Sequence, residues 1–86
     1  VAEIRDLDKS FWRRHASAPL THAERVFVHN NMAFLMNLSA QRDLLAAHLE
    51  AIGPDIIMWP WCYQVSGSYR GHLKDLRRQS GLKALR

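Results

Sequence analysis

Histidine is the residue type in this chain that most readily suggests metal binding or proton transfer. There are five, and only two of them, His22 and His29, fall on one helix face. Two helical turns, about 10 Å, separate this pair along the axis, whereas zinc sites gather several His or Cys ligands closely. We therefore predict no metal site and interpret the histidines as surface or interface residues: His15, His22, His29, His48 and His72.

The other residue types with catalytic potential also lack a suitable setting. Cys62, the one cysteine, stands in an apolar run between Trp61 and Tyr63, a position typical of a buried and unreactive thiol. The acidic residues are scattered and form no paired-carboxylate site. Residues 66–71 contain two glycines but not the G-x-x-x-x-G-K-[ST] pattern of a phosphate loop. The sequence predicts no catalytic residue, no cofactor and no metal, and hence no enzyme.

The positive charge of the chain is concentrated at its C-terminal end. Residues 70–86 contain six Lys and Arg against one Asp, residues 1–69 contain six against seven carboxylates, and the formal net charge is +4. A nearly neutral body with a cationic end favours contact with an acidic partner. Leu73 and Leu76 would pack inward, and the residues expected on the acidic surface are Arg70, Lys74, Arg77 and Arg78.

Helices must position these residues, and their ends are marked in the sequence. Apolar residues at helical spacing predict a helix over residues 2–16, which Pro19 then prevents from continuing. Thr21 and Glu24 form the pattern of a capping box, which predicts a helix start at Thr21. From there to Gly53 no glycine or proline interrupts the chain. Residues 21–53 are therefore predicted to be helical.

Residues 21–53 fit either one long helix or a pair of helices. A continuous apolar stripe favours a single helix of about 45 Å, and its members are Phe27, Phe34, Leu38, Leu45, Leu49 and Ile52. Ser39, by contrast, is a residue type that can cap a new helix at Ala40. A helix of this length would also exceed the usual range. We favour two helices folded back on each other and keep the single helix as the alternative.

Residues 56–65 form an aromatic segment in which two tryptophans flank a proline. The residue before Pro60 is biased towards extended backbone, so we predict an extended segment laid across the helices. In extended backbone Trp59, Trp61 and Tyr63 point to one side, and so short a chain has little interior for three such rings. We predict that they anchor the chain in a groove of a partner protein, with a membrane interface as the alternative. Two polar residues of the preceding apolar helix, Asn30 and Asn31, are predicted to contact a partner as well.

The predicted fold is a small all-α module, either a helical hairpin or three to four helices in one domain. To it are added the extended segment and a basic C-terminal helix or tail over residues 70–86. One cysteine permits no intrachain disulfide, and a core of this size supplies about 3–5 kcal/mol. We therefore do not expect the module to be stable on its own. No apolar run has the length of a transmembrane span.

These features predict a non-catalytic accessory subunit of a large multiprotein assembly. Its partners would be other protein subunits, with anionic lipid headgroups as a further contact for the basic end. A small, basic, tryptophan-rich chain that begins at Val1 suits a mature mitochondrial protein, peripheral to the inner membrane in a respiratory complex or ATP synthase. The alternative is a small RNA-binding structural protein of an organellar ribosome, whose basic end would contact phosphates.

Overall fold

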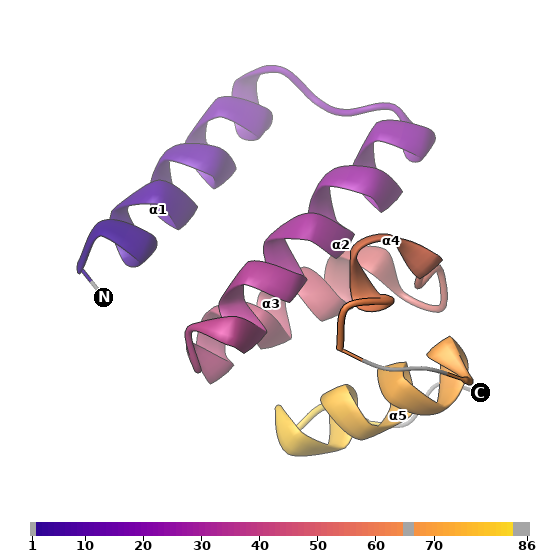
Figure 1. Cartoon of the computed structure of the whole chain (residues 1–86). Helices are drawn as coiled ribbons and strands as arrows, with labels where there is room; N and C mark the ends of the chain where they lie inside the picture. Colours follow the sequence, from indigo (N-terminus) through magenta and orange to yellow (C-terminus); the bar gives the residue numbers. More distant parts are fainter. Residues whose placement is uncertain (1, 65–66, 84–86) are drawn as a thin grey trace.

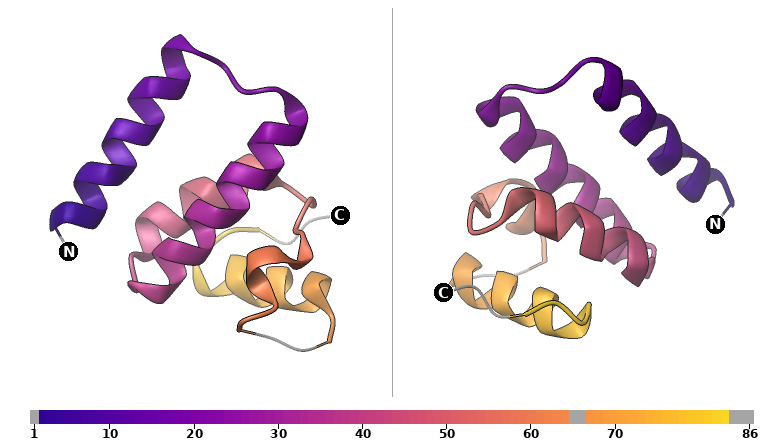
Figure 2. Two further views of the ribbon diagram at one scale, coloured as in Figure 1. Left: turned by 45° about the horizontal axis from the view of Figure 1, so that its top comes forward. Right: turned by 180° about the vertical axis from the view of Figure 1, so that it is seen from behind.

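The computed structural model describes residues 2–64 and 67–83, and every regular element within these ranges is a helix (Figure 1). The prediction of a small all-α module is confirmed. The elements are α1 (Ala2–Ser17), α2 (His22–Leu38), α3 (Arg42–Ile52), α4 (Met58–Trp61) and α5 (Tyr69–Gln79). Helices α2 and α3 form a central antiparallel pair, with α1 on one side of it and α5 on the other (Figure 2).

The N-terminal half follows the signals in the sequence closely. Helix α1 ends at Ser17, one residue beyond the predicted end, and a short connection through Pro19 leads to α2. Thr21 caps α2 with a complete capping box: its hydroxyl accepts from the amide of Glu24 at 3.3 Å, and the Glu24 carboxylate accepts from the amide of Thr21 at 3.0 Å. These bonds satisfy two backbone donors that a helix start leaves without partners.

The predicted pair of helices between Thr21 and Gly53 is present, so the single long helix is excluded. Ala40 has a φ of 56°, which a right-handed helix does not accommodate. Ser39 ends α2 instead of starting α3: its hydroxyl donates to the carbonyl of Leu35 at 2.7 Å. Gln41 occupies the N-cap position of α3 without a side-chain capping bond. The predicted role of Ser39 as an N-cap is therefore wrong, although the break lies where its position indicated.

The hydrophobic core uses a different face of α2 from the predicted stripe. Phe27 and Leu38 are more than half exposed, whereas Ala33 and Met36 are fully buried. Phe34 is half-buried and packs edge-to-face on Trp61, with ring centroids 5.5 Å apart. The core residues come from α2, α3, α4 and α5: Ala33, Met36, Leu45, Leu49, Ile52, Trp61, Leu73 and Leu76.

The aromatic segment contains a helical turn, so the prediction that residues 56–65 are extended throughout is wrong. Trp59 alone within α4 has non-helical backbone, with φ −87° and ψ 131°, as expected for the residue before Pro60. Successive side chains of a turn differ by about 100° in direction instead of 180°. Trp61 consequently points into the core and is fully buried, while Trp59 and Tyr63 point outward.

The side chain of Asn30, which is fully buried, fixes the position of this segment on α2. Its amide nitrogen donates to the carbonyls of Val26 at 2.7 Å and Asp55 at 3.0 Å. Its oxygen accepts from the indole N–H of Trp61 at 2.9 Å and from the backbone amide of Ile57 at 3.3 Å. One side chain thus satisfies polar groups from three parts of the chain that the core would otherwise bury without partners.

Helix α5 closes the far side of the core. Ser68 caps it by accepting from the amide of Gly71 at 3.0 Å. Leu73 and Leu76 pack inward as predicted, and the helix starts at Tyr69, within one residue of the predicted basic segment. The last part of the predicted tail, residues 84–86, lies outside the described residues.

Replacing Asn30 with Ala should lower the free energy of unfolding by about 3 kcal/mol, because the indole N–H of Trp61, the amide of Ile57 and the carbonyl of Asp55 lose their partner. The matched control is Asn31→Ala. Asn31 also donates to the carbonyl four residues earlier, at 2.8 Å from Phe27, but bridges to no other element, so its loss should cost about 1 kcal/mol or less. Urea denaturation followed by circular dichroism measures both, and equal losses would contradict the role assigned to Asn30.

Candidate functional site

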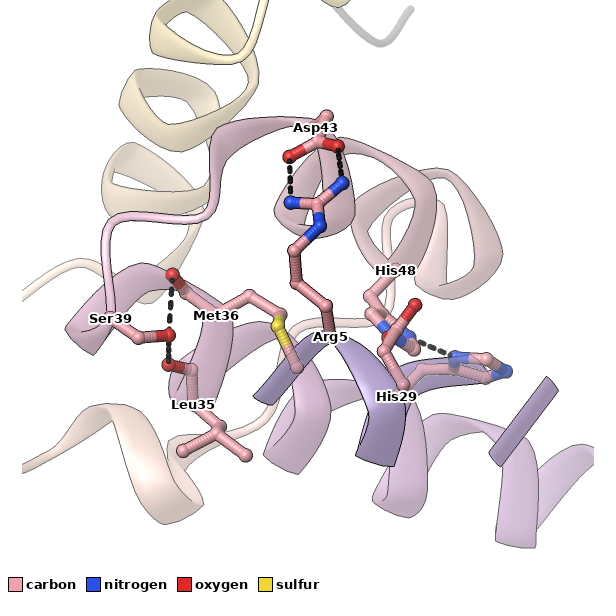
Figure 3. A network of polar contacts seen from close by, with 8 residues as sticks. Arg5, His29, Leu35, Met36, Ser39, Asp43 and His48 are labelled. Atoms are coloured by element: carbon pink, nitrogen blue, oxygen red, sulfur yellow. Dashed lines mark hydrogen bonds and ion pairs between the residues drawn. The ribbon is translucent and has the colours of Figure 1, made fainter. Parts of the chain in front are cut away.

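A buried chain of polar side chains links α1 to the central helix pair. The carboxylate of Asp8 on α1 lies 2.5 Å from Nε2 of His48 on α3. Nδ1 of His48 lies 2.8 Å from Nδ1 of His29 on α2. The two imidazole rings face each other across the gap between α2 and α3, and Figure 3 shows the bond that joins them. We call His29 and His48 the imidazole pair.

Aromatic side chains of α1 cover the imidazole pair. Trp12 stacks on His48 at 4.9 Å with an interplanar angle of 20°, and its ring lies 5.0 Å from that of His29. Phe11 approaches the same two rings edge-on, at 5.2 Å from His29 and 5.4 Å from His48. Asp8, His29 and His48 are all at most 5% exposed. The hydrogen bonds of this chain are therefore formed away from water, where they are stronger.

Hydrogen bonding assigns a proton to one nitrogen of each ring. Because the Asp8 carboxylate only accepts, Nε2 of His48 carries the hydrogen that it receives. In neutral His48 the other nitrogen, Nδ1, then holds a lone pair and accepts the N–H at Nδ1 of His29. The Nε2 atom of His29 is left with a lone pair, and it has no hydrogen-bond partner among the described residues. It is not one of the fully buried atoms without a partner, among which only the hydroxyl of Ser80 is found in the described residues.

Burial keeps the imidazole pair neutral. Burial lowers the pKa of His29 to about 4. Positive charge on His48, Arg25 or His15 lowers this pKa further, and the negative charge of Asp8 raises it in part. Burial also lowers the pKa of His48, although the hydrogen bond and charge of Asp8 act in the opposite direction. At a given pH, a smaller fraction of each ring is therefore protonated than in an ordinary histidine.

A groove of about 490 Å³ opens beside His29, between α1 and the ends of α2 and α3. Most of its walls are apolar, and Arg25, Glu50 and His15 supply the charged and titratable groups. We call it the α1 groove, and its lining residues are Trp12, His15, Ala16, Pro19, Leu20, Arg25, His29, Glu50 and Ala51. His29 is thus the one member of the buried polar chain that lines this groove.

The described part of the chain contains no group of three or more His, Cys, Asp or Glu side chains that could hold a metal ion. His22, considered with His29 in the sequence, is exposed and lies 3.8 Å from the carboxylate of Asp55. Cys62 is exposed, so the prediction that it is buried is wrong.

The residues predicted to contact a partner separate into two groups. Trp59 and Tyr63 are 47% and 69% exposed, and their rings meet edge-to-face with centroids 5.1 Å apart; we call them the α4 aromatic pair. Trp61 and Asn30 are fully buried and bonded to each other, so their predicted contact with a partner is wrong. Asn31 is half-buried and bonded to its own helix.

The predicted cationic contact is also divided. Arg70 and Lys74 are exposed, and the exposed Arg78 pairs with Asp75 at 3.1 Å. Arg77 is buried, and its Nε donates to the carbonyl of Lys83 at 2.9 Å. The prediction that Arg77 faces an acidic partner is therefore wrong, because this side chain secures the segment that follows α5.

A second groove, of about 890 Å³, lies between the start of α2 and the start of α5. Its apolar wall includes Phe27, Ile57 and Tyr69, and its polar rim includes Asp55 and Arg70. We call it the α5 groove. The groove reaches Ile57, which precedes Trp59 by two residues in the sequence, and the exposed cation of Arg70 lies on its rim. Apolar surface and an exposed cation therefore lie close together.

The prediction that His29 and His48 lie at the surface or at an interface is wrong, because both are buried. Sequence reasoning missed the buried polar chain, although a signal for it exists. Asp8 falls between Ile4 and Phe11 on one face of α1. His48 falls at helical spacing between Leu45 and Ile52. A polar residue within an apolar stripe is a candidate for a buried hydrogen bond, but the spacing does not say which polar groups meet.

Comparison with protein-family models, curated proteins and solved structures finds no match to this chain. Within the described residues, no helix is both long and apolar enough to cross a membrane. Function must therefore be argued from the surfaces and sites themselves.

The lowered pKa of His29 makes stability depend on pH. Between the ordinary histidine pKa of about 6.5 and the folded value of about 4, the unfolded chain binds protons that the folded chain does not. The free energy of unfolding should therefore fall as the pH is lowered through this window, by about 2 kcal/mol after allowance for solvent screening.

Urea denaturation at several pH values across this window tests the expectation. His29→Gln should remove a large part of the pH dependence, whereas His22→Gln, at an exposed position, should leave it unchanged. A wild-type slope that persists in His29→Gln would contradict the assignment to the imidazole pair.

Proposed function

We propose that the chain is a non-catalytic accessory subunit of a larger assembly, held there by its α4 aromatic pair. The observation that carries the proposal is the exposure of Trp59 and Tyr63 beside Met58, which is itself 61% exposed. Neighbouring large apolar side chains of this kind are uncommon on the surface of a chain that works alone. Tryptophan and tyrosine are also the residue types that supply much of the binding energy at protein interfaces.

The α4 aromatic pair is held in place before any partner binds. The two rings contact each other, and the turn that carries them is anchored through Trp61 and Asn30. An anchor that is already ordered loses little conformational entropy on association. Neither ring belongs to the hydrophobic core. Their exposure therefore does not serve the packing of this chain, which supports a role in binding.

The partner that fits this surface is a protein segment that is apolar at its centre and acidic at its edge. The α5 groove offers Phe27, Ile57 and Tyr69 to apolar side chains. Arg70 on its rim and Lys74 further along α5 are exposed cations without an ion pair among the described residues. Charge complementarity of this kind favours encounter with a carboxylate-bearing surface.

For the parent assembly we propose a mitochondrial inner-membrane complex, with the chain peripheral to the membrane. The support is its net charge of +4 and the exposed cations of α5, which suit acidic subunits and anionic headgroups near such a membrane. A nucleic-acid partner, as in an organellar ribosome, would use the same cations against phosphates. The experiment below distinguishes these two assemblies.

Replacing both Trp59 and Tyr63 with Ala should release the chain from its assembly. The expected loss is about 2 kcal/mol or more of binding free energy, which is at least a tenfold drop in the assembled fraction when binding is limiting. Native gel electrophoresis and sedimentation of the tagged chain from its own cells would measure that fraction. The control is Leu7→Ala, because Leu7 is 50% exposed on α1, away from this surface.

Three outcomes decide the proposal. Release of the double variant but not of Leu7→Ala, with both variants retaining helical circular dichroism, supports it. Unchanged sedimentation of the double variant contradicts the role of the α4 aromatic pair. Loss of the assembly on nuclease treatment would replace the membrane complex with the nucleic-acid alternative.

A further inference from the structure

The buried polar chain ends at a hydrogen-bond acceptor for which the partner-binding proposal has no use. His29 is 5% exposed, its Nδ1 is engaged by His48, and its Nε2 has no partner among the described residues. The same residue lines the α1 groove. This groove involves α1 and the beginning of α2, whereas α4 lies on the other side of the helix pair from α1 (Figure 2). The two sites can therefore be tested separately.

We propose that the α1 groove binds a small neutral molecule with an apolar, ring-like body and one hydroxyl group, which donates its hydrogen to Nε2 of His29. Phenol is the simplest member of this class. The hydroxyl would meet the acceptor at the inner end of the groove, and the ring would lie against apolar walls that include Trp12, Pro19 and Leu20.

The chain of hydrogen bonds makes His29 an acceptor instead of a donor. Asp8 fixes the hydrogen of His48 at Nε2, and this in turn fixes the hydrogen of His29 at Nδ1. Trp12 and Phe11 pack on both rings, which opposes rotation of the imidazoles. The lone pair at Nε2 is thus set in place before a ligand arrives, and this saves ordering cost on binding.

The charges around the groove favour a neutral ligand. Its lining contains both the cation of Arg25 and the carboxylate of Glu50, so neither an anion nor a cation would meet charges of the opposite sign alone. The hydrogen bond and ring contacts of His29 are with His48, Phe11 and Trp12, and the charges of Arg25 and Asp8 act on it in opposite directions. A hydroxyl donor satisfies the acceptor and adds no charge to a buried position.

Because His29 stays neutral, its Nε2 atom remains a hydrogen-bond acceptor under acidic conditions as well. Because burial lowers its pKa to about 4, the lone pair at Nε2 persists well below the pH at which an ordinary histidine would be protonated. His15, Arg25, Glu50, Asp8 and His48 are the charged or titratable groups that surround the site. Binding of a hydroxyl ligand should consequently change little between about pH 8 and about pH 5.

The test uses phenol and its methyl ether, anisole, on the full chain. Both have the same ring, but anisole lacks the hydrogen that would be donated. Titration followed by the ¹⁵N resonances of the histidine rings should show saturable phenol binding with a dissociation constant on the order of millimolar. Anisole should bind at least about tenfold more weakly, because it leaves Nε2 unpaired. The Nε2 resonance of His29 should move most.

Variants locate the acceptor. His29→Phe keeps a ring and removes the acceptor, so it should abolish the preference for phenol over anisole. His22→Gln, at an exposed position on the same helix, should retain that preference. If His29→Phe does not fold, the comparison of phenol with anisole on the wild-type chain still decides the question.

Each contrary result overturns the inference. Equal affinities for phenol and anisole would show that no hydrogen bond is formed. A hydrogen on Nε2 of His29 at neutral pH would show that the chain of bonds runs in the opposite direction. Phenol affinity that falls with an apparent pKa near 6.5, or resonance changes confined to Trp59 and Tyr63, would place binding elsewhere.

Discussion

The arrangement of this chain depends on how the aromatic segment is fixed to α2 by Asn30. This side chain holds Trp61, Ile57 and Asp55 through hydrogen bonds, of which the bond to Trp61 is buried. Trp61 then provides the surface on which Phe34 and His72 pack, at centroid distances of 5.5 and 5.3 Å. Because Trp61 points inward, the α4 aromatic pair is directed outward. One buried amide therefore both completes the core and determines which aromatic rings a partner can reach.

Helix α1 is attached by a different kind of interaction. No residue of α1 belongs to the central hydrophobic cluster, although Ile4 packs against it. The helix is held instead by the Asp8–His48 bond and by Phe11 and Trp12 over the imidazole pair. At its other end the guanidinium of Arg5 forms two bonds to the carboxylate of Asp43, at 2.6 and 3.2 Å (Figure 3). Polar contacts are directional, so α1 has a defined position without a large apolar interface.

The two attachments create surfaces of different character. Around α4 and the start of α5, exposed aromatic rings and cations lie on the outside, where association with a protein removes apolar area from water. Beside α1, His29 lines a groove with an acceptor that has no partner among the described residues, and a small molecule bound there would gain specificity from one hydrogen bond. The proposed partner surface and the proposed ligand site can both be present on a small helical module, because the central pair α2 and α3 separates them.

Local signals in the sequence determined the helices, and tertiary contacts determined the sites. The capping box at Thr21, the glycine at Gly53 and the proline at Pro60 act on neighbouring backbone, so they predicted where α2 begins, where α3 ends and where the aromatic segment departs from a helix. The break between α2 and α3 was favoured by the presence of Ser39 and by the usual length of helices, although Ser39 ends α2 and does not cap α3. Which face of α2 is buried was not decided locally: Phe27 is as apolar as Phe34, yet Phe27 is 53% exposed beside a groove, whereas Phe34 packs on Trp61. The bonded residues His29 and His48 are 19 positions apart, and Asp8 and His48 are 40 positions apart. No spacing rule relates residues on three different helices.

The direction of Trp61 depended on the helical turn of α4 and on its hydrogen bond to Asn30. The burial of Arg77 depended on its hydrogen bond to the carbonyl of Lys83. Periodicity describes one helix at a time, whereas burial and hydrogen bonding arise only when several helices have packed together.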